Sequence, residues 1–174
     1  MSSAFLGMLK AHPADAHNRR WAFVPYDQLS DRLGLLAELP PSRVGIVLVE
    51  TSWKPRQRPY HKQKLALLLA SQRHFALEQA RRGVAIRYVF GDEDYEAMLR
   101  PVAAELGPLE LMVPAERELR TSLETMVTEG LLQLRPHDGW MTAPADFNEA
   151  MKGKRQWRMD AFYRHIRKKY GWLM

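Results

Sequence analysis

The 174-residue sequence contains no cysteine. It therefore has no disulfide, no thiolate metal ligand and no cysteine-bound iron–sulfur cluster. No apolar run approaches the roughly 20 residues that a membrane-spanning helix needs. The first 20 residues carry a single lysine and a broken apolar patch, which makes a poor signal peptide. Together these absences favour a cytoplasmic protein with no membrane partner.

The common fingerprints of phosphate, dinucleotide and hydrolytic sites are also missing. The sequence has no GxGxxG, no P-loop, no HExxH and no GxSxG. Its six histidines show no metal-ligand spacing, so we predict no metal site. No pair of a nucleophile and a base stands out, so we predict no catalytic residue and do not expect an enzyme built on this chain alone.

The positive charge of the chain is confined to its end. The whole sequence carries a formal net charge of +6. Residues 151–174 hold eight Lys or Arg and one acid, which is a net charge of +7, so residues 1–150 carry −1. Basicity is thus a property of the last 24 residues rather than of the chain as a whole.

One stretch organises the rest of the sequence. Residues 44–49 form a continuous apolar run with four β-branched residues, which is typical of a central strand buried on both faces. A long helix begins near His61 and ends at Gly83, with apolar and amide side chains at helical spacing on one stripe. The polar loop from Glu50 lies between them, at the strand end where open α/β sheets bind ligands.

Strand and helix patterns alternate along the chain, and this order is typical of a doubly wound parallel sheet with helices on both faces. We predict a five-stranded Rossmann-like α/β domain over residues 21–150. Residues 1–20 are then an extension that is either mobile or a short helix packed on the domain. The expected strands cover 21–24, 44–49, 84–90, 109–113 and 131–135, and the expected helices 31–39, 61–83, 93–106 and 116–129.

Residues 151–174 are predicted to form a basic amphipathic helix. A short helix over 146–151 precedes it, and the last helix covers 158–169 with an apolar stripe among cations. Such a segment would either contact phosphates and stack on bases or dock on a partner domain, and both interpretations stay open. The candidate nucleic-acid or partner contacts, two of which open the long helix, are Lys62, Lys64, Lys154, Arg155, Arg158, Arg164, Arg167 and Lys168.

Polar and aromatic side chains follow the first two predicted strands. Asp27 and Gln28 come after the first, and Glu50 and Trp53 after the second. If the two strands are neighbours, these groups converge on one crevice, where they suit hydrogen bonding and stacking on a flat heterocycle. The alternative is that Asp27 caps a helix, Glu50 is solvated and Trp53 covers the sheet edge.

Several of these segments resemble the deoxyribodipyrimidine photolyase-related proteins, which include the bacterial iron–sulfur cryptochromes and six-four photolyases. The similar segments are DQL at 27–29, an HKxK segment leading into SxRHF between His61 and Phe75, and MxxFYRxxRKKxGxLM from Met159 to Met174. The similarity extends over roughly Trp21 to Met174.

The resemblance implies a photolyase-type N-terminal α/β domain that carries a ribityl-lumazine or flavin-like antenna chromophore. By position, it implies chromophore contacts at Asp27, Gln28 and Glu50. It also implies a helical domain, in the same or a separate chain, that holds FAD and a [4Fe–4S] cluster and serves light-dependent DNA repair or light sensing. Residues 151–174 would begin the linker to that domain, so we expect either a fragment or a naturally short protein.

Two departures from the family fall in the implied chromophore site. The family usually has a glycine before DQL, where this chain has Tyr26 after Pro25. Its second loop usually offers a further glutamate and a tyrosine, where this chain has Lys54 and Gln57. The chemistry of the implied site therefore differs from that of the family.

Overall fold

The protein is described by a computed structural model covering residues 3–153 and 155–172. The chain divides into two compact units. Met1–His137 is called the sheet unit, and Asp138–Met174 the helical unit. The helix Pro144–Met151 belongs to the helical unit, because it packs on the following helix, Met159–Tyr170.

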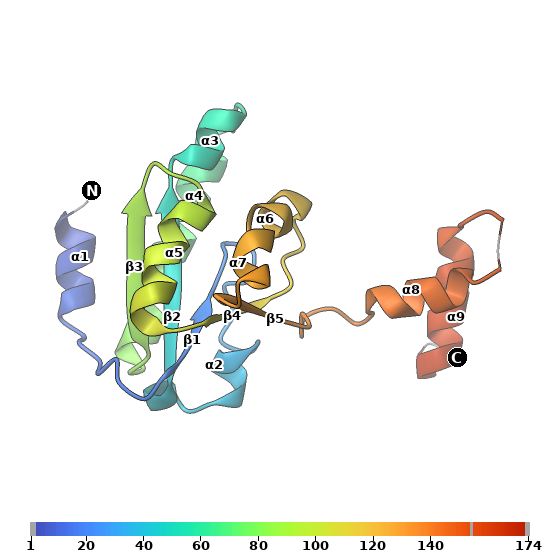
Figure 1. The fold of residues 1–174 in the computed structure, drawn as a ribbon, viewed down its shortest axis with the longest axis horizontal. Coiled ribbons are helices and arrows are strands. Elements are labelled where there is room, and N and C mark those ends of the chain that lie inside the picture. The colour runs from blue at the N-terminus through green and yellow to red at the C-terminus, as the bar shows by residue number, and fades with distance from the viewer. Residues whose placement is uncertain (1–2, 154, 173–174) are drawn as a thin grey trace. The chain divides into compact units, whose positions relative to one another are not determined.

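The sheet unit is built on a parallel sheet (Figure 1). Within the described residues it has five strands in the order β3-β2-β1-β4-β5, and every neighbouring pair is parallel. The predicted fold class is thus confirmed, and the strand order reverses between β1 and β4. The strands are β1 (Arg20–Phe23), β2 (Val44–Thr51), β3 (Ala85–Gly91), β4 (Leu109–Met112) and β5 (Leu132–Arg135).

Helices cover both faces of the sheet, and the side chains of β2 alternate between them. Val47 and Val49 join the core cluster beneath α5 (Tyr95–Leu106), α6 (Arg117–Ser122) and α7 (Glu124–Thr128). Ile46 and Leu48 join the cluster beneath α1 (Ser3–Lys10), α2 (Leu35–Glu38) and α4 (Lys62–Arg81). Because both faces are covered, β2 is apolar at every position from Val44 to Val49 instead of alternating, and only its last two residues, Glu50 and Thr51, are polar.

The N-terminal segment is a helix packed on the sheet unit, which is the second of the two predicted alternatives. Phe5 of α1 is buried. Its ring meets that of Tyr88 edge-on, with 4.9 Å between the centroids. Aromatic contacts of this kind fix α1 against the outer strand β3.

Two predicted helices were wrong in extent. The helix expected over 31–39 is reduced to α2, because Gly34, which precedes its first residue, takes a left-handed φ of 56° that a helix interior does not allow. The helix expected over 116–129 is split into α6 and α7 at Leu123, whose φ of −106° and ψ of 2° are not helical. The loop after Glu50 contains a short helix, α3 (Trp53–Gln57), and a 3₁₀ turn covers Pro41–Arg43.

The helical unit is a pair of packed helices, α8 (Pro144–Met151) and α9 (Met159–Tyr170). Phe147 of α8 meets Phe162 of α9 edge-on, with 5.3 Å between ring centroids. The Lys169 ammonium lies 2.9 Å from a carboxylate oxygen of Asp146 and 2.6 Å from one of Glu149. One cation of the basic tail therefore joins the two helices.

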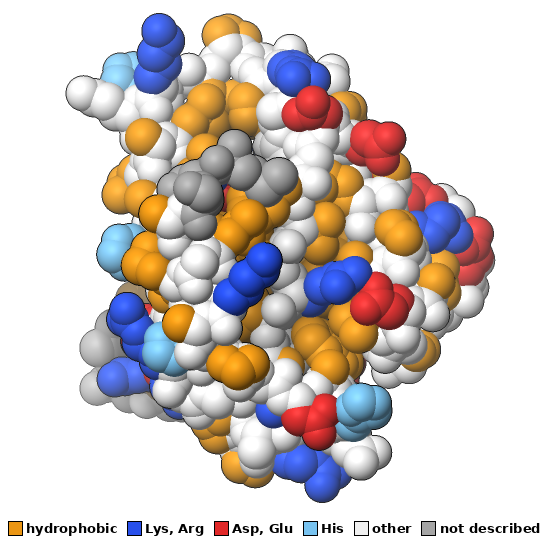
Figure 2. Space-filling view, turned by 90° about the vertical axis from the view of Figure 1, so that its left-hand side faces the viewer, with side chains coloured by type: hydrophobic (Ala, Val, Ile, Leu, Met, Phe, Trp, Pro, Cys, Tyr) orange, Lys and Arg blue, Asp and Glu red, His pale blue; other side chains and the backbone are white. Residues whose placement is uncertain are grey.

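Charges of both signs are mixed on the sheet unit. Residues 1–137 contain 18 basic and 16 acidic residues. On the face nearest α1, Lys, Arg, Asp and Glu side chains lie scattered among hydrophobic ones (Figure 2). The helical unit, with eight basic and four acidic residues, is the more strongly basic part.

Candidate functional site

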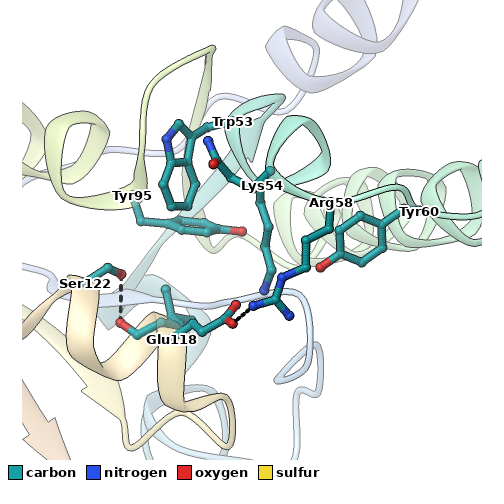
Figure 3. A pocket seen from close by; sticks show the side chains of 9 residues that line it. Trp53, Lys54, Arg58, Tyr60, Tyr95, Glu118 and Ser122 are labelled. Atoms are coloured by element: carbon teal, nitrogen blue, oxygen red, sulfur yellow. Dashed lines mark hydrogen bonds and ion pairs between the residues drawn. The ribbon is translucent and has the colours of Figure 1, made fainter.

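Two neighbouring cavities, together called the crevice, open at the carboxyl edge of the sheet. The larger has a volume of about 290 Å³ and is lined by residues at the carboxyl ends of β1, β2 and β4, among them Tyr26, Glu50 and Glu116. The smaller, of about 210 Å³, lies against α3, α5 and α6 (Figure 3). Because the loops after β1 and β4 both contribute, the crevice lies where the strand order reverses, the usual ligand position in open α/β sheets.

The short helix α3 brings polar and aromatic side chains into the crevice. Its start is tied to the loop after β3 by two hydroxyls. Thr51 Oγ1 donates to the Glu93 carbonyl at 2.6 Å, and Ser52 Oγ donates to Asp92 Oδ1 at 2.5 Å. These bonds join the ends of β2 and β3 and so hold Trp53 and Lys54 in place.

The first turns of α4 supply an apolar wall. Farther along the helix Phe75 and Ala76 are buried against the sheet. Leu65, Leu68 and Leu69 are only half-buried and line the larger cavity. The amino-terminal part of the predicted core stripe thus faces the crevice instead of the sheet.

Lys54, Glu116 and Tyr26, called the Lys54 cluster, form the polar wall. The Lys54 ammonium pairs with Glu116 Oε2 and lies 3.1 Å from the Tyr26 hydroxyl, which itself donates to the same Glu116 oxygen at 2.8 Å. Burial favours the protonated acid, but the bonds from Lys54 and Tyr26 hold the pKa of Glu116 below its ordinary value. Burial and the neighbouring carboxylate raise the pKa of Tyr26, so at neutral pH the cluster holds a carboxylate and a neutral phenol.

Tyr95, the first residue of α5, borders both cavities. It is 7% exposed, and its hydroxyl points toward Lys54 (Figure 3). Burial raises the pKa of Tyr95 to about 12, so the phenol stays protonated at neutral pH. The hydroxyl forms no hydrogen bond with any residue that the structure describes.

Two of the predicted chromophore contacts line the crevice. Trp53 borders the smaller cavity and Glu50 the larger. The Glu50 carboxylate is already engaged, because Arg73 pairs with it through both oxygens and the Tyr88 hydroxyl donates to it at 2.9 Å. Glu50 therefore also anchors α4 to the sheet.

The other two predicted contacts lie outside both cavities. Asp27 is exposed. Gln28 is buried, and its amide donates to the Met112 carbonyl at 3.0 Å, which ties the loop after β1 to β4. The structure therefore does not bring Asp27 and Gln28 together with Glu50.

Glu116 and Tyr95 are crevice residues that the sequence analysis missed. Glu116 follows β4 and Tyr95 follows β3. Ligands in open α/β sheets bind at the carboxyl ends of the strands, so this rule, which indicated Glu50, could have indicated both residues. Lys54 and Tyr26 stood out only as departures from the family. Lys54 and Tyr26 pair with Glu116 over 62 and 90 positions of sequence, and no local pattern shows such a contact.

The predicted cationic contacts fall into different environments. Lys62 is exposed, whereas Lys64 lines the larger cavity, with its ammonium 5.9 Å from the Tyr60 ring centroid. Lys154 lies outside the described residues. Asp160 in α9 pairs with two arginines, with Arg164 at 2.5 Å and with Arg158, the residue before the helix, at 3.4 Å. The Arg167 guanidinium lies over the Tyr163 ring. Arg155 and Lys168 are exposed.

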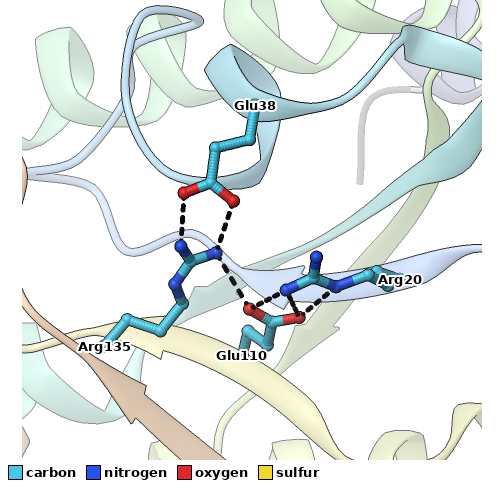
Figure 4. Close-up of polar contacts among 4 residues, drawn as sticks. All are labelled: Arg20, Glu38, Glu110 and Arg135. Atoms are coloured by element: carbon cyan, nitrogen blue, oxygen red, sulfur yellow. Dashed lines mark hydrogen bonds and ion pairs between the residues drawn. The ribbon is translucent and has the colours of Figure 1, made fainter.

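A second charged cluster lies on the sheet, between β1, β4, β5 and α2 (Figure 4). Arg20 donates to both oxygens of Glu110 at 2.7 and 2.9 Å, and Arg135 bridges Glu110 and Glu38. The charges alternate in sign and each has a partner. This cluster therefore reads as a structural network that ties α2 to the sheet.

Residues 3–153 and 155–172 contain neither a candidate metal site nor a candidate membrane-spanning helix. No group of three or more His, Cys, Asp or Glu side chains is placed to hold a metal ion. None of the helices there is both long enough and apolar enough to cross a bilayer.

Comparison with known proteins identifies the family. A family model described as deoxyribodipyrimidine photo-lyase-related protein matches residues 22–174. The chain belongs to this family. A (6-4) photolyase from Agrobacterium fabrum (strain C58 / ATCC 33970) is 26% identical over 157 residues, which is 85% of this chain and 31% of the photolyase. The resemblance seen in the sequence is thus confirmed, and this photolyase-related chain spans about a third of the length of that relative.

Proposed function

We propose that the sheet unit is the antenna module of a photolyase-related protein, which holds a flat heterocyclic chromophore in the crevice. Its role would be light harvesting toward an FAD-binding helical domain carried by the same or a separate chain, in light-dependent DNA repair or light sensing. The chromophore, once bound, supplies the absorption, and the protein fixes its position and orientation without bond chemistry.

The composition of the crevice carries the proposal. Part of its lining is apolar, from Leu65, Leu68 and Leu69, and another part offers the charges of Lys54 and Glu116. Apolar walls with a few placed polar groups are typical of small-molecule sites. The position at the point of strand reversal supports the same interpretation.

The size of the crevice favours a two-ring chromophore. The larger cavity, about 290 Å³, lies near the lower limit of about 300–1,000 Å³ that is usual for ligand pockets. A ribityl-lumazine has two fused rings, so it suits this cavity better than the three rings of a flavin. Tyr26 and Lys54 occupy space on one side, which also favours the smaller ring system.

Binding of a ribityl-lumazine to the full chain tests the proposal. Lumazine fluorescence, followed as protein is added, is expected to change saturably, and the midpoint of heat unfolding is expected to rise with ligand concentration. Riboflavin serves as the three-ring comparison and is expected to bind more weakly. If neither compound gives saturable binding or a shift in the unfolding midpoint, the antenna function is wrong.

A second candidate function is contact with nucleic-acid backbone through the helical unit. Arg155 and Lys168 are exposed and make no ion pair with any described carboxylate, and the Trp157 side chain beside Arg155 is 71% exposed. Exposed cations with an aromatic side chain suit phosphate contact and base stacking.

Salt dependence separates this candidate from docking on a protein partner. Phosphate contacts predict that affinity for single-stranded DNA falls steeply with salt, and that the double variant Arg155→Glu, Lys168→Glu loses most of it. The same reversals at Arg56 and Arg58 of the sheet unit are the control. If DNA affinity is absent or insensitive to the helical-unit variant, the nucleic-acid candidate fails.

A further inference from the structure

The outer edge of β5, the last strand of the sheet, has unpaired backbone groups. On the inner edge, which pairs with β4, the carbonyls of Leu131 and Arg135 accept from backbone amides. Because backbone groups alternate in direction along a strand, the amides and carbonyls of Leu132 and Leu134 point to the outer edge. No described residue bonds to them there. An unpaired edge of this kind is a template for another strand.

A partly apolar groove lies beside this edge. It has a volume of about 480 Å³ and is lined by α6, α7 and the last two strands. The Leu134 side chain, which lines it, is 47% exposed. Arg117 and Glu124 also line the groove, and neither forms an ion pair within the described part of the chain. The edge and the groove, together called the β5 surface, thus combine unpaired backbone groups, an exposed leucine and two unpaired charges.

We propose that a second copy of this chain binds the β5 surface, so that two sheets join into one across a two-fold axis. Such a contact requires a surface that is complementary to itself. The sequence Leu132-Gln133-Leu134 reads the same in both directions. Antiparallel pairing about Gln133 therefore places Leu132 of each copy opposite Leu134 of the other, and each such pair exchanges both backbone hydrogen bonds.

The residues next to β5 favour this register over its neighbours. Pairing centred on Leu134 would place Pro136 opposite Leu132, and proline has no amide to donate. Pairing centred on Leu132 would place Gly130 opposite Leu134, and Gly130 has a φ of 76°, which is not the conformation of a strand. Pairing about Gln133 uses all the outward groups of Leu132 and Leu134.

The side chains fit the same arrangement. On the face of α6 and α7, the exposed Leu134 gains a leucine neighbour from the second copy, which removes apolar surface from water. On the other face, the exposed Gln133 meets its own counterpart, and two amide groups can donate to and accept from each other. A groove that carries one unpaired cation, Arg117, and one unpaired anion, Glu124, is complementary in charge to its own copy.

Sedimentation of the full chain over a range of concentrations tests the proposal. A short strand pair offers few contacts beside the roughly 1,200 Å² of a standard interface, so we expect a dimer that dissociates on dilution. Leu134→Lys places a charge on the edge and is expected to weaken the dimer at least about tenfold. Leu67→Lys is the matched control, because Leu67 is an exposed leucine of α4, and it is expected to leave the dimer unchanged.

A single introduced cysteine tests the symmetry of the contact, because the chain has no cysteine of its own. In the proposed register Gln133 meets its counterpart at a non-hydrogen-bonded pair, where Cα atoms lie about 4.5 Å apart, within the range of a disulfide. Gln133→Cys is therefore expected to give a disulfide-linked dimer on mild oxidation, more slowly when combined with Leu134→Lys. Gln63→Cys, at an exposed glutamine of α4, is the control and is expected to cross-link far more slowly.

Three results would overturn the proposal. The first is a chain that stays monomeric up to about 1 mM. The second is a dimer whose dissociation constant is the same in Leu134→Lys, and the third is a Gln133→Cys variant that cross-links no faster than Gln63→Cys. The β5 surface is separate from the crevice, so none of these results bears on chromophore binding, which is tested independently.

Discussion

Single side chains determine which parts of the crevice stay open. Lys54 and Tyr26 stand where related proteins are expected to have smaller or oppositely charged residues, and both are held by Glu116. The sequence showed these residues as departures. Their meaning became visible only when the structure placed Glu116, from beyond β4, beside them, because the contact joins residues distant in the chain.

The Lys54 cluster predicts a dependence of stability on pH. The pKa of Glu116 in the folded protein lies below its ordinary value of 4.5, so the folded state favours the charged carboxylate. The resulting stabilisation is present above the unfolded pKa and is lost as the pH falls through the lower, folded pKa. Urea unfolding between neutral pH and about pH 3 is expected to show a loss that Glu116→Gln reduces by about 1.5 kcal/mol.

Glu118→Gln serves as the control for this measurement, because Glu118 is more exposed and lies outside the Lys54 cluster. It is expected to leave the pH dependence nearly unchanged. If the Glu116 and Glu118 variants respond to pH alike, Glu116 does not carry the effect.

The packing of Trp21 requires a glycine on the adjacent strand. Gly45 lies opposite Trp21 in the register of β1 and β2, and a Cβ atom at Gly45 would come within 2.4 Å of the indole. Gly45→Ala is therefore expected to lower the free energy of unfolding by about 1–3 kcal/mol, as overpacked core substitutions do. Chemical denaturation followed by tryptophan fluorescence measures the change.

Gly7→Ala is the comparison for Gly45→Ala. Gly7 lies in α1, where an added Cβ meets no atom within 4 Å. Alanine favours the helix over glycine, so this variant is expected to be neutral or slightly stabilising. An equal loss of stability in both variants would contradict the packing explanation.

At the scale of elements, sequence patterns predicted correctly the helices and strands whose residues have the same surroundings along their whole length, as the buried strands do. All five strands were located because buried parallel strands are apolar and bounded by turn residues. The helix over 116–129 was overextended because leucine is a good helix former, so propensity gives no sign of the break at Leu123. The helix over 31–39 was overextended because its apolar pattern outweighed the glycine at 34, where the helix breaks. The start of α4 was placed correctly, yet its apolar stripe serves the sheet at one end and the crevice at the other.

The start of α5 depends on a capping carboxylate. Asp94 is the N-cap, and its side chain accepts from the Ala97 amide at 2.8 Å. Asp94→Ala is expected to cost about 1 kcal/mol in the free energy of unfolding, whereas Asp94→Ser keeps a capping oxygen and most of the stability. Equal losses in the two variants, measured by thermal unfolding, would show that capping is not the cause.

At the scale of the whole molecule, the chain consists of a sheet unit and a helical unit with different charge. The sequence revealed the basic tail but not its internal pairing. Lys169 is taken up by Asp146 and Glu149, and Arg164 by Asp160, so the number of cations open to a partner is smaller than the count suggested.

Lys169 is expected to hold the helical unit together. In Lys169→Gln, the two carboxylates of α8 lose their common partner, so hydrogen exchange of α8 amides should become faster. Lys168→Gln is the matched control, because the adjacent Lys168 is exposed and makes no ion pair with a described residue. If α8 amides exchange at the same rate in both variants, Lys169 does not stabilise the helical unit.

The position of the chromophore is the central claim, and a pair of neighbouring substitutions tests it most directly. Leu68 lines the larger cavity, whereas Leu67, one position earlier, is 66% exposed and is not among the lining residues. We predict that Leu68→Trp, which fills the cavity, weakens ribityl-lumazine binding at least about tenfold, and that Leu67→Trp leaves it unchanged. If both variants bind the lumazine as tightly as the unmodified protein, the crevice is not the chromophore site.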